Sequence, residues 1–368
     1  MKFITNRDQL LVVLQRIVNV IEKRQTMPIL SNVLIQLKDN RLFLTGTDTE
    51  IQIISSLVVN DDNDEGEITV PARKFLDICR LLPVGAEIKF EQQDDKVKVT
   101  SGRSRFLLNT LPADSYPEFN EPEADYQLAI KGGKFKKGLD KTLFCMANQD
   151  VRYYLNGLLL HISNSKLKLV ASDGHRLALF EDDLEAATGY EARIILPRKA
   201  VHEISRLIDD EDIDLKIEFS SQHIKIFYEQ MIFSSKLIDA KFPDFSKVFQ
   251  QSMNVPISIP KQALRDALVR VAILANEKYK GITFDIIDRI LKLSTHNPEH
   301  DEAEEEISID YEGQAINISF NAQYLLDAVS NLDSESILIT IAANLSSCFI
   351  DDEDVNAGYR YIVMPMRL

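Results

Sequence analysis

The chain repeats one pattern at an interval of about 125 residues, and this repeat limits its possible folds more than any other feature. An amphipathic segment that begins at Pro71 returns 126 residues later at Pro197, and a third version begins 124 residues further on, at Asn321. Another helical pattern precedes each of these segments, starting near Arg7, Gly133 and Pro260. Because about 120 residues is an ordinary domain size, the sequence predicts three domains of one fold.

Runs of alternating apolar and polar residues lie between the helical patterns and predict strands. Examples are NVLIQLK from Asn32, KLKLVAS from Lys166 and GITFDII from Gly281. The expected fold class is therefore α+β, with helix, strands, helix, strands in each copy. Boundaries in the Pro- and acid-rich stretch near 120–127 and in QQSMNVPI give domains 1–125, 126–253 and 254–368. The first two copies also end alike, in SYPEF at 115–119 and KFPDF at 241–245.

The charge of the chain is divided between helices and strands. The whole sequence has a formal net charge of -15, yet the six helical segments together hold eighteen basic and seven acidic residues. On the helix from Pro71, Arg73 and Arg80 point away from the apolar face, and Lys199 and Arg206 repeat this arrangement in the second copy. If the helices share one side of the molecule, that side attracts a polyanion while the strand-rich side repels it.

A single basic run such as KGGKFKK is usually a solvated helix end, so the argument depends on the bias of all the helices together. The sequence has no Gly-rich phosphate cradle, no base-reading finger and no interleaved aromatic platform. The expected nucleic-acid contacts are therefore to phosphates and independent of base sequence.

Composition excludes several other classes of protein. Polar residues interrupt every apolar run, so neither a signal peptide nor a membrane span fits. Cys79, Cys145 and Cys348 are odd in number and far apart, which suits a reducing compartment and gives no zinc-binding spacing. We expect a cytoplasmic protein without a metal or other cofactor.

Several longer motifs resemble one known family. They include MKFITNRDQLL at the start, TVPARKFLDICR at 69–80, QDVRYYLNG at 149–157, SDGHRLA at 172–178, SSKLIDAKFPDF at 234–245 and the terminal VMPMRL. Together they resemble the bacterial DNA sliding clamps, the beta subunits of DNA polymerase III, from Met1 to Leu368. The resemblance implies the clamp fold, in which two chains of three domains close a ring with helices lining the hole and antiparallel sheets outside.

The resemblance also implies a function without catalysis. Such a clamp encircles double-stranded DNA without sequence preference and tethers the replicative polymerase, which confers processivity. The implied partners are a second copy of the chain, the DNA polymerase III alpha subunit, the clamp loader complex, and other polymerases and repair proteins that carry short peptide motifs.

Two sets of binding residues are carried over from the resemblance. The implied DNA contacts are Arg24, Arg73, Gln149, Tyr153 and Tyr154, with Arg80, Lys199 and Arg206 as supporting charges. The implied partner-peptide pocket consists of Leu155, Ser172, Gly174, His175, Arg176, Leu177, Pro243, Val248, Met364, Pro365, Met366, Arg367 and Leu368. Family members often have Thr and Arg where this chain has Ser172 and Lys247, which affects peptide preference rather than the pocket itself.

A third set forms the implied interface of a head-to-tail homodimer. Phe106 and Leu108 at one end of the chain resemble the residues that meet Ile273 and Leu274 at the other end. Acidic Glu299, Glu302 and Glu305 are expected to pair with basic Lys74, Arg103 and Arg105 of the second chain.

Two other interpretations of the sequence are weaker. Asp48, Asp173 and His175 could form an acid/base cluster of a phosphate-handling hydrolase. However, Asp48 and Asp173 occupy equivalent turns of different copies, where the third copy has His296 and Asn297, so the repeat favours turns. The acidic run HDEAEEE at 300–306 lacks the Gly and the alternating ligands of a calcium loop, which favours a solvated or ion-paired surface.

Overall fold

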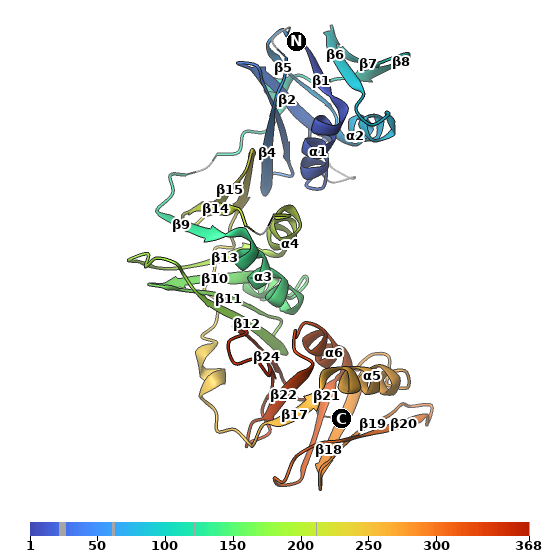
Figure 1. Cartoon of the computed structure of the whole chain (residues 1–368), viewed down its shortest axis with the longest axis vertical. Helices are drawn as coiled ribbons and strands as arrows, with labels where there is room; N and C mark the ends of the chain where they lie inside the picture. The colour runs from blue at the N-terminus through green and yellow to red at the C-terminus, as the bar shows by residue number, and fades with distance from the viewer. Residues whose placement is uncertain (22–26, 61–62, 121, 211, 368) are drawn as a thin grey trace. The chain divides into compact units, whose positions relative to one another are not determined.

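The computed structural model describes all residues except 22–26, 61–62, 121, 211 and 368 (Figure 1). The described residues fall into two compact units. Unit 1 comprises residues 1–136 and 202–237, and unit 2 comprises residues 137–201 and 238–368. The division runs through the middle repeat, so its two helices each continue from one unit into the other.

Each repeat contains the same order of elements twice: a strand leads into a helix, and three strands follow. The first repeat consists of β1 (Lys2–Asn6), α1 (Arg7–Val18), β2 (Asn32–Lys38), β3 (Arg41–Thr47), β4 (Ile51–Val58), β5 (Gly66–Pro71), α2 (Ala72–Leu81), β6 (Glu87–Gln93), β7 (Lys96–Ser101) and β8 (Ser104–Asn109). The second consists of β9 (Tyr126–Lys131), α3 (Gly132–Thr142), β10 (Gly157–Ser163), β11 (Lys166–Ser172), β12 (Arg176–Asp183), β13 (Glu191–Pro197), α4 (Arg198–Leu207), β14 (Asp214–Phe219), β15 (His223–Tyr228) and β16 (Met231–Lys236).

The third repeat keeps this order. It consists of β17 (Ile257–Pro260), α5 (Lys261–Ala272), β18 (Gly281–Ile287), β19 (Ile290–His296), β20 (Glu302–Ser308), β21 (Ile316–Asn321), α6 (Ala322–Ser330), β22 (Ser336–Ile341), β23 (Cys348–Asp352) and β24 (Tyr359–Val363). Short 3-10 turns include η4 (Tyr153–Asn156) and η5 (Ser246–Gln250). The α+β class and the predicted alternation of helices and strands are confirmed.

The second helix of each repeat begins directly after the residue that marks the repeat in the sequence. Pro71 ends β5 and immediately precedes α2, where its fixed φ and missing N–H are tolerated. Asn321 takes this position before α6, and its side-chain oxygen accepts the backbone N–H groups of Gln323 and Tyr324. The third copy therefore exchanges a proline for a side-chain cap, and the helix begins at the same point.

Each unit contains one eight-stranded and one four-stranded antiparallel sheet. In unit 1 the large sheet has the order β5-β2-β3-β4-β16-β15-β14-β9, and in unit 2 the order is β13-β10-β11-β12-β24-β23-β22-β17. Each large sheet thus joins two repeats through one strand pair, β4 with β16 or β12 with β24. We call these two strand pairs the joints. The small sheets are β1-β6-β7-β8 in unit 1 and β20-β19-β18-β21 in unit 2.

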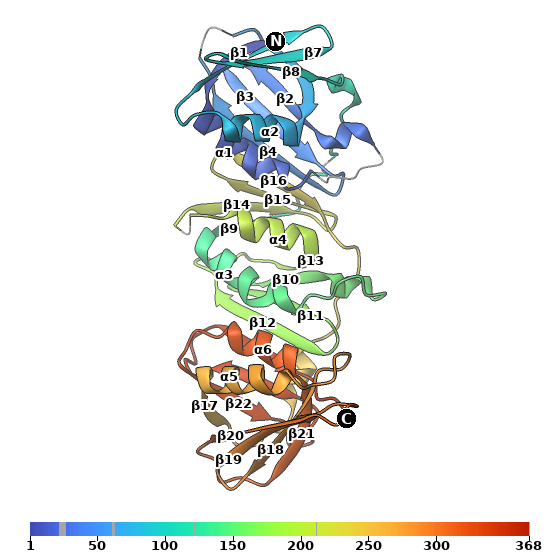
Figure 2. The same cartoon turned by 90° about the vertical axis from the view of Figure 1, so that its right-hand side faces the viewer.

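Pairs of helices cover one face of the sheets in each unit. In unit 1, α1 packs against α2, β3 and β4, and in unit 2, α5 packs against α6, β19 and β20 (Figure 2). The predicted apolar stripe of α1 is buried at Leu10, Leu14 and Ile17, while Val12, its exception, is exposed. On α2, Phe75 and Cys79 are fully buried, and Phe75 meets Phe90 edge-on. The apolar faces of α1 and α2 are therefore the core, as their periodicity predicts.

Candidate functional site

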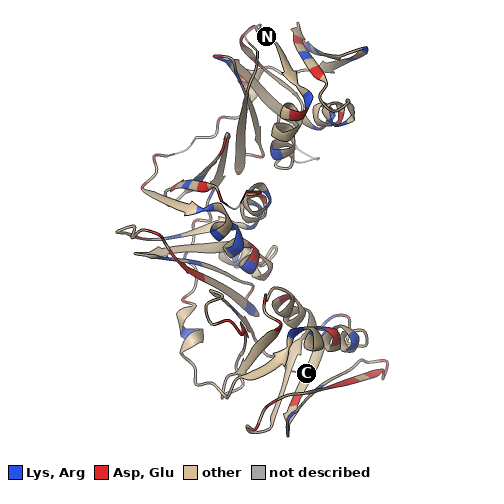
Figure 3. Cartoon of the chain, viewed as in Figure 1, with Lys and Arg blue, Asp and Glu red and all other residues tan. Residues whose placement is uncertain are grey.

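Basic side chains follow the exposed faces of the helices, and several are already held by backbone carbonyls. Figure 3 shows Lys and Arg along α3 and α5. The Arg73 guanidinium donates to the carbonyl of Ile21 at 2.8 Å, and Lys136 Nζ donates to the carbonyl of Ser205 at 2.5 Å. Helix C-termini and loops present such carbonyls. Arg73 is thus half-buried and fixed in direction, while its neighbour Lys74 is exposed.

The other predicted phosphate contacts of the helices differ in how they are held. Arg80 is exposed and lies 3.6 Å from the carboxylate of Asp77. Arg206 pairs with Glu203 at 2.6 Å, and Lys199 is half-buried. Arg24 lies outside the described residues.

A rigid loop in unit 2 carries the predicted contacts Gln149, Tyr153 and Tyr154. The Asp150 carboxylate accepts the backbone N–H and the guanidinium of Arg152, and these hydrogen bonds lower the pKa of Asp150 to about 2. The Asn156 side chain donates to the Asp150 carbonyl and accepts its N–H. As a result the loop projects Tyr153 into solvent, whereas Tyr154 packs against the sheet.

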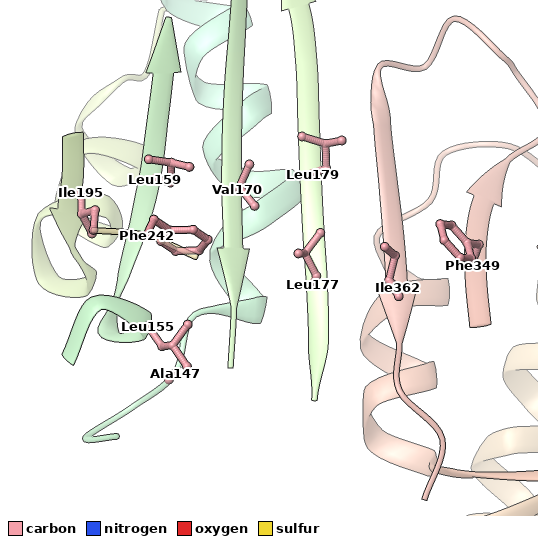
Figure 4. Close-up of a cluster of buried hydrophobic side chains, with 10 residues drawn as sticks. All are labelled: Ala147, Leu155, Leu159, Val170, Leu177, Leu179, Ile195, Phe242, Phe349 and Ile362. Carbon is pink, nitrogen blue, oxygen red and sulfur yellow. The ribbon is translucent and has the colours of Figure 1, made fainter. Parts of the chain in front are cut away.

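Four of the predicted pocket residues come together on an apolar cluster of unit 2. Leu155 and Leu177 are buried in this cluster with Phe242, Phe349 and Ile362 (Figure 4). Val248 and Met364 are half-buried and pack against it. Residues that are far apart in the sequence therefore share one apolar surface, which agrees with a shallow site for large apolar side chains.

The turn between β11 and β12 forms the polar edge of this surface. Ser172 Oγ donates to the carbonyl of Arg176 at 2.7 Å and accepts the N–H of Gly174. Gly174 has a φ of +88°, and a Cβ there would lie 2.7 Å from the Arg152 guanidinium, so the turn requires glycine. The carbonyl of His175 accepts the N–H of Met364 at 2.8 Å, which ties the turn to the C-terminal segment.

Arg176 holds the joint together from inside. Its guanidinium pairs with Asp173 at 3.0 Å and with Asp327 at 2.5 Å, and it donates to the carbonyl of Phe144 at 2.9 Å. It also lies over the ring of Tyr324, 4.4 Å from the centroid. Only 12% of the side chain is exposed. Because these contacts within the chain occupy the guanidinium, the role of Arg176 in this geometry is structural.

The C-terminal segment is anchored where it leaves β24. Met366 bridges to Ser319 through an N–H···O hydrogen bond of 2.8 Å, and Met364, Pro365 and Met366 are half-buried. Arg367 is exposed, and Leu368 lies outside the described residues. The role of this segment in binding stays a prediction.

Comparison with known proteins decides the family. The models of the N-terminal, central and C-terminal domains of the DNA polymerase III beta subunit match residues 1–120, 129–244 and 246–367. The chain belongs to the DNA polymerase III beta subunit family. It is similar to the beta sliding clamps of Pseudomonas aeruginosa, at 41% identity, and of Escherichia coli K12, at 38%, over all of each chain. The crystal structure of the beta subunit from Pseudomonas aeruginosa matches with a TM-score of 0.97 at 40% identity, over all of both chains.

The chain is therefore a sliding clamp of DNA polymerase III and a processivity factor without catalysis of its own. The acid residues considered for a hydrolase agree with this function. Asp173 accepts the backbone N–H groups of His175 and Arg176, and Asp48 accepts those of Glu50 and Ile51. Both carboxylates close hairpin turns, as the repeat predicts.

The described residues contain no group of three or more His, Cys, Asp or Glu side chains placed to hold a metal ion. Among the same residues, no helix is both long and apolar enough to cross a membrane.

The predicted dimer residues of the clamp lie on α2, on the strands and turns of the small sheets, and directly after α5. Ile273 is 74% exposed and Leu274 is half-buried. Lys74, Arg103, Arg105, Glu299 and Glu302 are exposed. Phe106 is half-buried, whereas Leu108 is buried within unit 1 and Leu107 points outward. Glu305 pairs with Arg270 of its own chain at 2.6 Å.

The sequence reasoning missed several residues that build the joint of unit 2. Lys141 Nζ pairs with Asp333 at 2.5 Å, donates to the carbonyl of Asn331 and lies over the ring of Tyr359. Asp327 and Tyr324 of α6 hold Arg176. The signal in the sequence is that α6 has no Lys or Arg, and that Tyr324 stands where the first copy has Lys74.

Proposed function

We propose that two copies of this clamp close head to tail into a ring around duplex DNA and tether the polymerase to it. The observation that supports this most strongly is a basic set of helices in a chain of net charge -15. Such helices attract phosphates without reading bases, so the clamp can slide while its ring keeps it linked. In this proposal Arg73, Arg80, Lys199 and Arg206 face the DNA, with Gln149 and Tyr153 on the loop of unit 2.

Two unpaired strand edges support the second copy as the partner. Among the described strands, β8 forms one edge of the small sheet of unit 1, and β20 forms one edge of the small sheet of unit 2. An exposed edge strand pairs readily with another chain. The β8 edge carries Arg103 and Arg105, and β20 has the sequence EAEEEIS, marked red along its length in Figure 3.

We infer the register of this pairing from the joints of the two units. Position by position, β20 corresponds to β4 and β12, and β8 corresponds to β16 and β24. Ile54 pairs with Ile232 in one joint, and Leu179 pairs with Arg360 in the other. In this proposal the same register brings Glu304 opposite Arg105 of the second copy. Glu304, which lies 2.7 Å from Lys292 of its own chain, then also pairs with Arg105, while Glu305 stays with Arg270.

A charge swap tests the dimer. We expect Arg105→Glu to weaken the dimer through repulsion by Glu304, and Arg105→Glu with Glu304→Arg to restore it, as measured by sedimentation. Ile273→Ala with Leu274→Ala should also shift the mass toward the monomer because the variant removes apolar contact from the interface. A double charge swap no better than the single variant would reject the register.

We further propose that the apolar cluster of unit 2 receives short peptides of the polymerase alpha subunit, the clamp loader and other replication and repair proteins. The support is the convergence of Leu155, Leu177, Val248 and Met364 on one surface. Cytoplasmic localisation is part of the proposal, and the three buried, unpaired cysteines are consistent with it.

Retention on DNA tests the ring. Clamp loaded onto nicked circles by the loader and ATP should survive a high-salt wash, because a closed ring does not depend on phosphate contacts to stay linked. Cutting the circle should release it. Equal loss from circular and linear DNA at high salt would reject encirclement.

A further inference from the structure

A groove runs along unit 2 beside the apolar cluster. It encloses about 1170 Å³ over β12, β24, β23 and β22, and the segment from Phe245 to Pro256 forms one wall. It is separate from the predicted pocket residues, since Leu155, Leu177, His175 and Met364 are not in its lining.

The floor of the groove continues the apolar cluster of the pocket. Leu177 and Leu179 are two residues apart on β12 and face the same side, Leu177 toward the pocket and Leu179 in the groove (Figure 4). Phe349 belongs to both the cluster and the groove lining. A chain bound at the pocket can therefore extend into the groove over apolar surface without crossing a polar barrier.

The walls of the groove are rigid and partly aromatic. Arg360 pairs with Asp351 through two bonds of 2.8 and 2.9 Å, and its guanidinium lies over the rings of Phe249 and Phe349. This pairing and stacking fix the direction of Phe249, which lies on the wall segment. Val355, at the opposite side, is 90% exposed, so the groove has apolar side chains that solvent reaches.

The charge around the groove is predominantly acidic. Six of its lining residues are acidic and three are basic. Lys166 and Lys168 both bind Glu181, at 2.5 and 2.6 Å, and Lys166 also lies 3.9 Å from the carboxylate of Asp183. Burial raises the pKa of Glu181, but the hydrogen bonds from the two lysines lower it by more. The net pKa is below the ordinary value, so Glu181 stays ionised at neutral pH. Asp183 and Asp354 add negative charge at the solvent side.

We propose that this groove binds the basic flank of a partner peptide whose apolar anchor sits in the adjacent pocket. The inference rests on the proposed function of that pocket. The flank is an extended segment in which lysine or arginine alternates with apolar residues, so that apolar side chains face Leu179 and Phe349 and cations face Asp183 and Asp354. The groove then selects among partners by charge, and the pocket supplies the common anchor.

The test uses two synthetic peptides with the same leucine-phenylalanine anchor, one flanked by lysines and one by glutamates. We expect the lysine-flanked peptide to bind the full-length clamp about tenfold more tightly at low salt, with the difference reduced at high salt. The variant Asp183→Lys with Asp354→Lys should reverse the preference. Equal affinity of the two peptides, or an unchanged preference in this variant, would overturn the proposal.

A spin label locates the flank directly. The three native cysteines are buried, so Val355→Cys supplies a reactive thiol for a nitroxide. We expect this label to broaden the NMR signals of the lysine flank, while a matched label at Ile287→Cys, on the small sheet of unit 2, leaves them sharp. A flank that stays sharp with the Val355 label would reject the groove.

One variant separates the groove from the pocket. Met364→Lys should weaken both peptides equally if the pocket holds the common anchor. If it weakens neither while the charge preference and the Val355 broadening persist, the groove stands and the pocket assignment fails. If it weakens both but the preference is absent, the pocket stands and the groove fails.

Discussion

The two joints share one design, yet an apolar pocket surface is built on the joint of unit 2. SYPEF and KFPDF end the first two repeats, and each contributes a buried aromatic side chain to its unit. In unit 1, Tyr116 packs on Ile29 and Leu30 and its hydroxyl donates to the carbonyl of Thr45 at 3.0 Å. In unit 2, Phe242 packs into the large cluster. The same chain path therefore ends in a small cluster with a hydroxyl hydrogen bond in one case, and in a large apolar cluster in the other.

Register-matched positions explain this difference. Thr45 of unit 1 corresponds to Val170 of unit 2, and the remaining matched pairs are Gln52 with Leu177, Ser234 with Ile362, and Lys225 with Phe349. At each position a polar side chain replaces an apolar one. A repeated backbone thus supplies two similar platforms, and in the proposed function these four differences decide which platform binds an apolar peptide.

A reciprocal exchange gives the largest expected effect. Leu177→Gln places the unit 1 residue in the pocket, and we expect peptide affinity to fall by at least about thirtyfold, the range of a lost hot-spot contact. Isothermal titration measures this loss. The matched control is Gln52→Leu, which should leave affinity unchanged because the other unit 1 positions remain polar. A melting scan checks that both variants are folded, and normal binding by folded Leu177→Gln would show that the cluster is not the site.

A second exchange compares the two platforms in stability. Phe349 is buried, and Phe349→Ala should lower the free energy of unfolding by about 3 to 5 kcal/mol because it removes a large side chain and leaves a cavity. Lys225→Ala, at the matched position, should change it by less than about 0.5 kcal/mol. Because a chain with two units need not unfold in one step, hydrogen exchange of β23 and β15 is the measurement. Equal effects would mean that the two platforms do not differ in packing.

A third exchange tests the charged core of the joint in unit 2. Arg176 corresponds to Ile51 of unit 1, which is buried and apolar. Arg176→Ile should cost about 3 kcal/mol, because Asp173 and Asp327 lose their cation. Adding Asp327→Leu should recover part of the loss. Calorimetry of the two variants measures the recovery, and a double variant less stable than the single one would contradict this account.

The sequence predicted the repeat, the helices and their apolar faces because periodicity reports directly on burial. It missed the strand before each helix, although MKFITN and EARIILP contain the apolar residues of a short strand. These strands have at most seven residues, and the helix that follows dominates the pattern. Short elements of this kind become evident only from their partners in a sheet.

The pocket was found through family motifs rather than through physical reasoning from the residues. Leu177 and Phe349 are ordinary strand residues, and only the register of β12, β24 and β23 brings them together. The structural role of Arg176 could not be predicted from the sequence either, because its partner Asp327 is 151 residues further along the chain. Pairing between distant strands and helices carries this information, and a local sequence window cannot report it.

The smallest expected effect concerns the contacts made by the chain directly after α4 and α6. Asp352 accepts the backbone N–H groups of Asp333 and Ser334, at 2.9 and 3.1 Å, and the hydroxyl of Tyr359. Tyr228, at the matched position in unit 1, accepts the N–H groups of Asp209 and Asp210 through its hydroxyl oxygen. Burial raises the pKa of Asp352, but its hydrogen bonds with Ser334 and Tyr359 outweigh burial and lower it.

This difference predicts that acid loosens one helix end and spares the other. Because the pKa of Asp352 is lower in the folded chain than in the unfolded chain, its stabilising contribution is complete at neutral pH and declines as the pH falls below about 4. Tyr228 keeps its proton throughout this range. Hydrogen exchange corrected for intrinsic rates should therefore show the amides of Asp333 and Ser334 losing protection in acid while those of Asp209 and Asp210 keep theirs. In Asp352→Asn the first pair should be less protected at neutral pH and should change less on acidification than in the native sequence, since only Asp333, whose pKa is also lowered, still titrates there. Parallel loss at both helix ends in the native sequence would mean that acid acts on the units as a whole and not through this carboxylate.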